Sequence, residues 1–131
     1  MFSHIMIGTN HLEHAKQFYD AVLGVLGAGE PMRNQAPSGH ARLFYLHDGG
    51  MFCVTEPING EPATFANGGT IGFKCHSPEQ VQAFHDVAVA HGGQSIEAPP
   101  GLRARIIGDR PHFPNQTRHH YQYRHTNQIQ G

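Results

Sequence analysis

The chain lacks most of the features that mark specialised classes of protein. It holds only two cysteines, Cys53 and Cys75, which are too few for a disulfide framework, so we expect both to be small buried hydrophobic residues. No apolar run is long enough to span a bilayer, and the N-terminus lacks a secretory signal. Nucleophile elbows, phosphate-binding loops and paired-cysteine zinc motifs are also absent. These absences favour a cytoplasmic protein that makes no use of a membrane.

Charge is scarce and unevenly distributed. Charged residues make up 15% of the 131 residues and the formal net charge is −1, which argues against a dedicated nucleic-acid binder. The 38% of apolar residues suits one globular domain with a real core. Residues 1–100 carry nine acidic and four basic residues, whereas residues 101–131 carry five arginines and one aspartate. An abrupt shift of this kind indicates a boundary near residue 100.

The first part of the chain alternates strand and helix patterns. Residues 2–8 predict a strand, and a helix with apolar residues at helical spacing follows the candidate N-cap Asn10 and ends at Gly24 or Gly27. The remaining elements predicted before residue 57 are a short strand over 28–33, a loop over 34–38, strands over 40–47 and 51–56, and a hairpin turn at Asp48-Gly49-Gly50.

The same order then begins again. Residues 70–75 predict a strand, and Ser77 to Gln80 form a strong helix start with Ser at the N-cap, Pro at the first helical position and Gln completing a capping box. Gly92-Gly93 ends that helix, and a strand is expected over 94–97. The pattern is therefore βαβββ followed by at least βαβ, a coarse internal repeat.

Several motifs in this order point to one family. They are His4 on the first strand, a first helix that closes on Phe18-Tyr19 and Leu23-Gly24, the strands around Phe44-Tyr45 and 52–56, and Ile71-Gly72-Phe73 before the second helix. Together they resemble the vicinal-oxygen-chelate superfamily of glyoxalase I, bleomycin-resistance proteins and extradiol dioxygenases. The resemblance implies an α+β fold in which two βαβββ modules, 1–57 and 69–131, form a curved mixed sheet around a cleft in one domain. It also implies a homodimer.

The end of the chain departs from the family pattern. Relatives close with an Asp-Pro-Asp/Glu-Gly turn and a last strand that often carries a metal-binding Glu, and neither is present here. Residues 101–131 contain only eight apolar residues, with poor alternation. We therefore expect an incomplete second module and an atypical or disordered tail, arising from divergence or from an altered reading frame.

The resemblance also implies one divalent metal ion (Zn, Ni, Fe or Mn) held by His and Glu from four strands. His4 matches the first ligand position, and Glu56 lies two residues beyond Val54, where the family glutamate aligns. Glu56 is thus the candidate second ligand and the candidate catalytic carboxylate. Thr70 occupies the third position, so two ligands of four are present. The alternative is a cleft without metal, in which His4 is a hydrogen-bonded cleft residue and Glu56 a solvated carboxylate.

A further set of side chains alternates onto the presumed inner face with His4. Apolar walls with a few polar groups are typical of small-molecule sites, and the two cations of the set could hold an anion. The simpler interpretation places the aromatic residues in the core and the cations on solvated faces. The candidate substrate-binding residues are Met6, Arg42, Phe44, Phe52, Thr70 and Lys74.

Three functions remain open from the sequence. The first is a glyoxalase-like enzyme of small-molecule metabolism, a metal-dependent lyase, isomerase or dioxygenase-like protein related to lactoylglutathione lyase. The second is a metal-free protein that sequesters a small, anionic ligand, as bleomycin-resistance proteins do. The third is a non-catalytic dimer whose function lies in partner contacts. The sequence names no substrate, since one fold hosts many chemistries.

Overall fold

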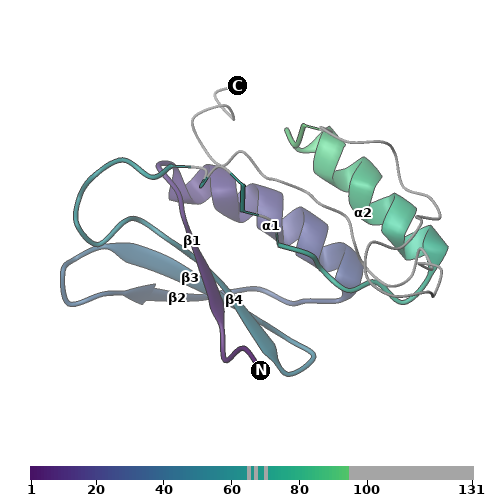
Figure 1. Cartoon of the computed structure of the whole chain (residues 1–131), viewed down its shortest axis with the longest axis horizontal. Helices are drawn as coiled ribbons and strands as arrows, with labels where there is room; N and C mark the ends of the chain where they lie inside the picture. The colour runs from purple at the N-terminus through teal and green to yellow at the C-terminus, as the bar shows by residue number, and fades with distance from the viewer. Residues whose placement is uncertain (65, 67, 70, 95–131) are drawn as a thin grey trace.

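The computed structural model describes residues 1–94 except 65, 67 and 70 (Figure 1). In this part of the chain, four strands and two helices follow the order βαβββα. Their bounds are β1 (Ile5–Gly8), α1 (Leu12–Leu26), β2 (Met32–Gln35), β3 (Ala41–His47), β4 (Gly50–Thr55) and α2 (Pro78–Ala90).

The four strands form one mixed sheet in the order β1-β4-β3-β2. β1 pairs with β4 in parallel, and the β2–β3 and β3–β4 pairs are antiparallel. α1 packs on β3 and β4, and α2 packs on α1 (Figure 1). The prediction of an α+β fold is therefore confirmed, and the first βαβββ unit is present as expected.

The β3–β4 hairpin follows its sequence signal closely. His47 pairs with Gly50, so Asp48 and Gly49 form a two-residue turn, with φ values of 50° and 79°. Positive φ at both central residues is the backbone that matches the right-handed twist of the strands. The predicted turn at these residues is confirmed, and it fixes the register between the two strands.

The start of α1 differs from the prediction. The N-cap is His11, whose side chain makes no capping bond, and Thr9 Oγ1 accepts the His11 N–H at 3.1 Å. The Asn10 carboxamide instead accepts the N–H of Ala63 at 2.7 Å and donates to its carbonyl oxygen at 3.2 Å. The predicted Asn10 cap was wrong because a loop 53 residues away competes for that side chain.

The buried face and the end of α1 agree with the sequence pattern. Gly27 adopts φ +100° directly after the helix, and its N–H donates to Gly24 O at 3.0 Å. Only glycine takes this left-handed conformation without strain, so the helix ends there. The residues that α1 buries are Ala15, Phe18, Tyr19, Val22 and Leu23.

β2 lies further along the chain than predicted. The expected strand over 28–33 is found at Met32–Gln35, so its last two residues fall in the segment predicted as a loop. All four of its residues are exposed, so no apolar alternation reveals the strand. Its place is set by pairing with β3, from Met32 opposite Phe44 to Gln35 opposite Ala41.

Residues 71–75 are described but are not assigned to a strand, contrary to the prediction for 70–75. Their side chains still alternate, because Ile71, Phe73 and Cys75 pack into the core whereas Gly72 and Lys74 are exposed. Strand assignment requires backbone pairing, and these residues pair with none of the four described strands. The predicted strand over 94–97 and the tail over 101–131 fall almost entirely outside the described residues, so the incomplete second module stays a prediction.

α2 begins as its sequence indicates. Ser77 Oγ accepts the N–H of Gln80 at 3.1 Å, and the Gln80 carboxamide oxygen accepts the N–H of His76 at 2.6 Å. The same carboxamide donates to Val25 O at 3.0 Å, which ties the start of α2 to the end of α1. Val81, Phe84 and Ala88 form its buried face. The predicted capping residues and apolar stripe are confirmed.

The two cysteines are free and buried, as expected, but they lie in different surroundings. Cys75 belongs to the core between the helices and the sheet, whereas Cys53 lies outside that cluster. Among the described residues, neither helix is both long and apolar enough to cross a membrane.

Candidate ligand-binding site

The sheet has two faces that differ in what covers them. The helix face packs against α1 and consists of Ile5, Ile7, Leu43, Tyr45, Phe52 and Val54. The far face is turned away from α1. Directly paired residues point to the same side of a sheet, so the register assigns to it Met6, Arg42, Phe44, Cys53 and Thr55.

This register corrects one predicted residue. Phe52 lies on the helix face, against Tyr19 at 4.9 Å between ring centroids, and not beside Met6 and Phe44. Cys53 takes the place that Phe52 was expected to hold. Phe52, Cys53 and Val54 are all apolar and all buried, so period-two alternation could not show which of them points to which face.

The far face presents one cation in an apolar setting. Arg42 Nε donates to Asn34 Oδ1 at 2.7 Å, and its guanidinium carbon lies 5.6 Å from the centroid of the Phe44 ring. Met6 is 39% exposed beside the fully buried Cys53. Burial raises the pKa of the Cys53 thiol, partly opposed by the positive charge of Arg42. Three of the predicted ligand contacts, Met6, Arg42 and Phe44, therefore share this face.

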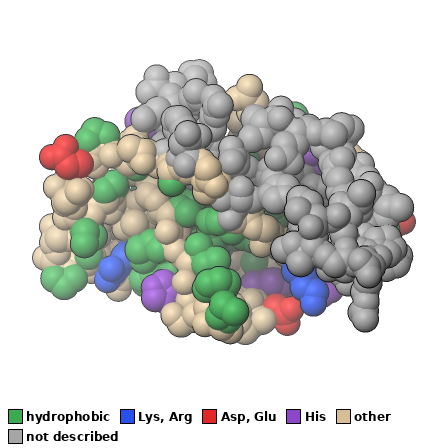
Figure 2. All heavy atoms as spheres, viewed as in Figure 1, with side chains coloured by type: hydrophobic (Ala, Val, Ile, Leu, Met, Phe, Trp, Pro, Cys, Tyr) green, Lys and Arg blue, Asp and Glu red, His purple; other side chains and the backbone are tan. Residues whose placement is uncertain are grey.

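Arg42 has unused hydrogen-bonding capacity. Its guanidinium carries five N–H donors, and only Nε has a partner within the described residues. No ion pair joins it to a carboxylate in that part of the chain. Hydrophobic side chains also reach the surface over the region of the sheet (Figure 2). Met32 and Leu46 are both more than half exposed. A half-buried cation beside an aromatic ring is suited to an anion with an apolar part.

The two predicted metal ligands lie at opposite ends of the sheet. His4 is exposed, precedes β1, and its Nδ1 is 2.9 Å from Ser3 Oγ. Because Ile5 pairs with Phe52, His4 lies level with Met51, five residues before Glu56. At about 3.3 Å per residue, roughly 16 Å of strand separate His4 from Glu56. The two side chains are therefore not placed to bind one ion.

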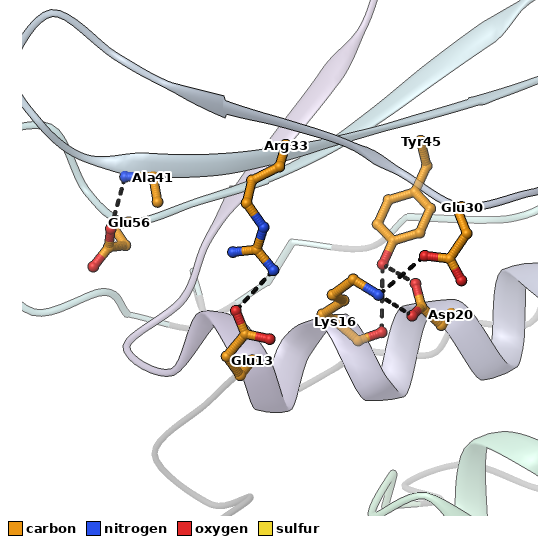
Figure 3. A network of polar contacts seen from close by, with 8 residues as sticks. All are labelled: Glu13, Lys16, Asp20, Glu30, Arg33, Ala41, Tyr45 and Glu56. Carbon is orange, nitrogen blue, oxygen red and sulfur yellow. Dashed lines mark hydrogen bonds and ion pairs between the residues drawn. The ribbon is translucent and has the colours of Figure 1, made fainter.

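Glu56 already has a structural partner. Its Oε1 accepts the N–H of Ala41 at 2.7 Å, just past the end of β4 (Figure 3). Within the described residues, no group of three His, Cys, Asp or Glu side chains could hold a metal ion. Thr70, at the third predicted position, lies outside the described residues. The residues that the structure describes therefore do not fit a metal centre.

A cavity of about 310 Å³ opens on the helix side of the sheet. Its walls come from the start of β1, the end of α1, the β3–β4 hairpin and residues 71–76. Phe52 and Lys74, two of the predicted ligand contacts, line this cavity, whereas Arg42, Met6, Phe44, His4 and Glu56 do not. Sequence reasoning did not find the cavity, because it forms where segments far apart in the chain meet.

Polar contacts also lie on the helix side of the sheet, around α1 (Figure 3). Lys16 Nζ lies 2.6 Å from Asp20 Oδ2 and 3.2 Å from Glu30 Oε2, and these hydrogen bonds raise the pKa of Lys16. Arg33 of β2 reaches Glu13 of α1 at 2.8 Å. Both cations have carboxylate partners, whereas Arg42 has none in the described part of the chain. The Arg33–Glu13 pair joins β2 to α1, and Arg42 remains the candidate anion contact.

Comparison with known proteins now identifies the family. The model of the glyoxalase/bleomycin resistance protein/dioxygenase superfamily matches residues 1–104. The crystal structure of a glyoxalase/bleomycin resistance protein from Albidiferax ferrireducens T118 is 51% identical, with a TM-score of 0.72 over 79% of this chain and 82% of that chain. A search of curated proteins finds no match. The chain belongs to the glyoxalase/bleomycin resistance protein/dioxygenase superfamily.

Membership in the glyoxalase/bleomycin resistance superfamily accounts for all six described elements, since each lies within residues 1–104. It does not select a ligand or a reaction. The roles of His4, Glu56 and the ligand contacts, the homodimer and the cytoplasmic location all stay predictions. For this superfamily member, the best-supported site is the far face with Arg42, which has no carboxylate partner among residues 1–94 as described.

Proposed function

We propose that this protein binds a small anionic metabolite on the far face of its sheet, as a metal-free binding member of its superfamily. The observation that carries this proposal is the environment of Arg42. Its guanidinium is half-buried, is held by Asn34 through Nε, and lies over Phe44 without a carboxylate partner among the described residues.

The contacts around Arg42 indicate what it would bind. With Nε engaged by Asn34, the terminal N–H groups remain for a carboxylate or phosphate, which they can bind in pairs. Phe44 and Met6 provide apolar contact on the same face. The ligand class is therefore a small acid with an apolar or aromatic part.

Thermal-shift and calorimetric titration against a panel of 2-oxo acids, 2-hydroxy acids and aromatic acids tests the proposal. A ligand that binds the folded state raises the melting temperature. Arg42→Ala should weaken the binding of at least one hit at least about tenfold, equivalent to about 1.4 kcal/mol. Arg33→Ala is the matched control, because Arg33 lies on a neighbouring strand and pairs with Glu13 on the other face. Equal affinity in wild type and Arg42→Ala for every hit would contradict the proposal.

A metal-dependent lyase, isomerase or dioxygenase-like reaction is the competing function. The observation that favours it is the exposed His4 imidazole beside β1, at the position that the family uses for a ligand. This function requires further ligands from outside the described residues. Metal analysis of tag-free protein and of His4→Ala tests it: about one equivalent of a divalent metal that disappears in the variant would support the metalloenzyme. Substoichiometric metal unaffected by the substitution would rule it out.

A further inference from the structure

We propose that the cavity on the helix side of the sheet is a second ligand site, separate from Arg42 and selective for a small acid with an aromatic or branched aliphatic body. Tyr45 and Phe52 line this cavity, and both belong to the helix face. Arg42 and Phe44 belong to the opposite face. The thickness of the sheet therefore separates the two sites, and this inference does not depend on the proposed function.

The volume of the cavity suits a small molecule. Its volume of about 310 Å³ lies at the lower end of the range for ligand pockets, which begins at about 300 Å³. A buried apolar cavity of about 150 Å³ accommodates benzene. An aromatic ring with a short acidic side chain therefore fits, with room for ring substituents.

The walls of the cavity are apolar and rich in aromatic rings. Phe52 and Phe73 meet edge to face, with centroids 5.2 Å apart and planes at 78°. Leu23 and Leu26 come from the last turns of α1, and Ile71 comes from the segment that follows residue 70. Such walls bind the apolar part of a ligand, because they remove it from water and contact its rings.

The charged and imidazole groups among the lining residues come from two segments, the β3–β4 hairpin and residues 74–76. They are Lys74 and the imidazoles of His47 and His76, with Asp48 as the one acid among the lining residues. Lys74 is exposed and forms no ion pair with any described residue. The His47 ring lies over the end of α1, since its Cε1 is 3.5 Å from where a Cβ on Gly27 would lie. The lining residues thus include one cation and two imidazoles but one carboxylate, which favours a ligand with an anionic head group.

Calorimetric titration of the full chain with phenylacetate and with its neutral analogue phenylacetamide tests this site. Ala28 lines the cavity, so Ala28→Phe fills it and should weaken phenylacetate binding more than tenfold. Lys74→Gln should weaken phenylacetate at least threefold and phenylacetamide hardly at all. Arg33→Ala, at a residue that does not line the cavity and that pairs with Glu13, should leave both affinities unchanged.

A second measurement uses the wild-type protein, so its result does not depend on whether a variant folds. Intermolecular nuclear Overhauser effects should connect the phenylacetate ring to methyl groups of Leu23, Leu26 and Ile71, which line the cavity. Undiminished affinity in a folded Ala28→Phe protein would overturn the inference. Contacts to Met6 instead, with binding lost in Arg42→Ala, would also overturn it while supporting the proposed function.

Discussion

Tyr45 of β3 donates a hydrogen bond of 2.7 Å to Oδ1 of Asp20 on α1, which joins the sheet to the helix that covers it (Figure 3). The other oxygen of Asp20 lies 2.6 Å from Lys16 Nζ. Burial and the neighbouring carboxylate raise the pKa of the Tyr45 phenol, so it remains the donor. The ring of Tyr45 is therefore buried in the core while its hydroxyl group is hydrogen-bonded to Asp20.

Tyr45→Phe should destabilise the protein by about 1–2 kcal/mol, because it removes a hydrogen bond to a charged group while keeping the ring in the core. Urea denaturation followed by circular dichroism measures the change. Glu30→Gln is the control: it removes the exposed partner of Lys16 and should cost less than about 0.5 kcal/mol. Equal effects of the two substitutions would contradict the importance of the Tyr45–Asp20 bond.

Gly27→Ala and Gly24→Ala should change stability in opposite directions. Gly27 has φ +100°, which an alanine adopts only with strain, so we expect a loss of about 1 kcal/mol. Gly24 lies within α1, and an added Cβ there would meet nothing within 4 Å. Alanine at residue 24 should therefore stabilise the helix by about 0.5–1 kcal/mol. Thermal unfolding of the two variants side by side provides the comparison, and a shift of the same sign in both would refute it.

Gln80→Ala should destabilise α2 more than Ser77→Ala does. Loss of the Ser77 hydroxyl removes one capping bond, which costs about 1 kcal/mol. Loss of the Gln80 carboxamide removes the bond to His76 N–H and the bond to Val25 O, which also holds α2 to α1. Chemical denaturation measures both, and Gln82→Ala, at an exposed position of the same helix, is the control. A Gln80→Ala effect no larger than that of the control would disprove the role of the carboxamide.

Stability should fall between pH 9 and pH 11 through Cys75. Burial raises the pKa of its thiol from 9.0 to about 11, so in this window the folded state retains a proton that the unfolded state has lost. The stabilisation is fully present below pH 9 and is lost as the pH rises through 11, with a slope of at most about 1.4 kcal/mol per pH unit.

Unfolding free energies measured at several pH values for wild type and Cys75→Ala test this dependence. The alanine variant loses core packing at every pH. The comparison therefore uses the slope of the unfolding free energy against pH, and not its value at any one pH. Cys53 and Tyr45, whose pKa values are also raised, remain in both proteins and contribute equally. Parallel curves for the two proteins would exclude Cys75 as the source.

The sequence predicted the elements that carry local signals. Asp48 and Gly49 indicate a two-residue turn, Ser77 and Gln80 a helix start, and the spacing from Ala15 to Leu23 a helix with one buried face. Each signal depends on residues that lie close together in the sequence. The motifs also sufficed to predict the superfamily, which the comparisons confirm.

The predictions that failed depended on distant partners. Asn10 binds Ala63 in place of the helix end, and β2 forms at four exposed residues because β3 pairs with them. Phe52 was assigned to the wrong face, since three consecutive buried residues on β4 leave the alternation ambiguous. A shift of one residue reverses the face of every side chain in a strand.

The sequence by itself determined the helices, the hairpin and the family, because capping, turn geometry and helical periodicity act over short distances along the chain. Only the tertiary structure decided that Arg42 and Phe44 share the far face while Phe52 and Lys74 line the cavity. It also placed His4 and Glu56 at opposite ends of the paired strands β1 and β4. Strand register and the packing of residues 71–76 against α1 set these positions, and both depend on contacts between segments far apart in the sequence.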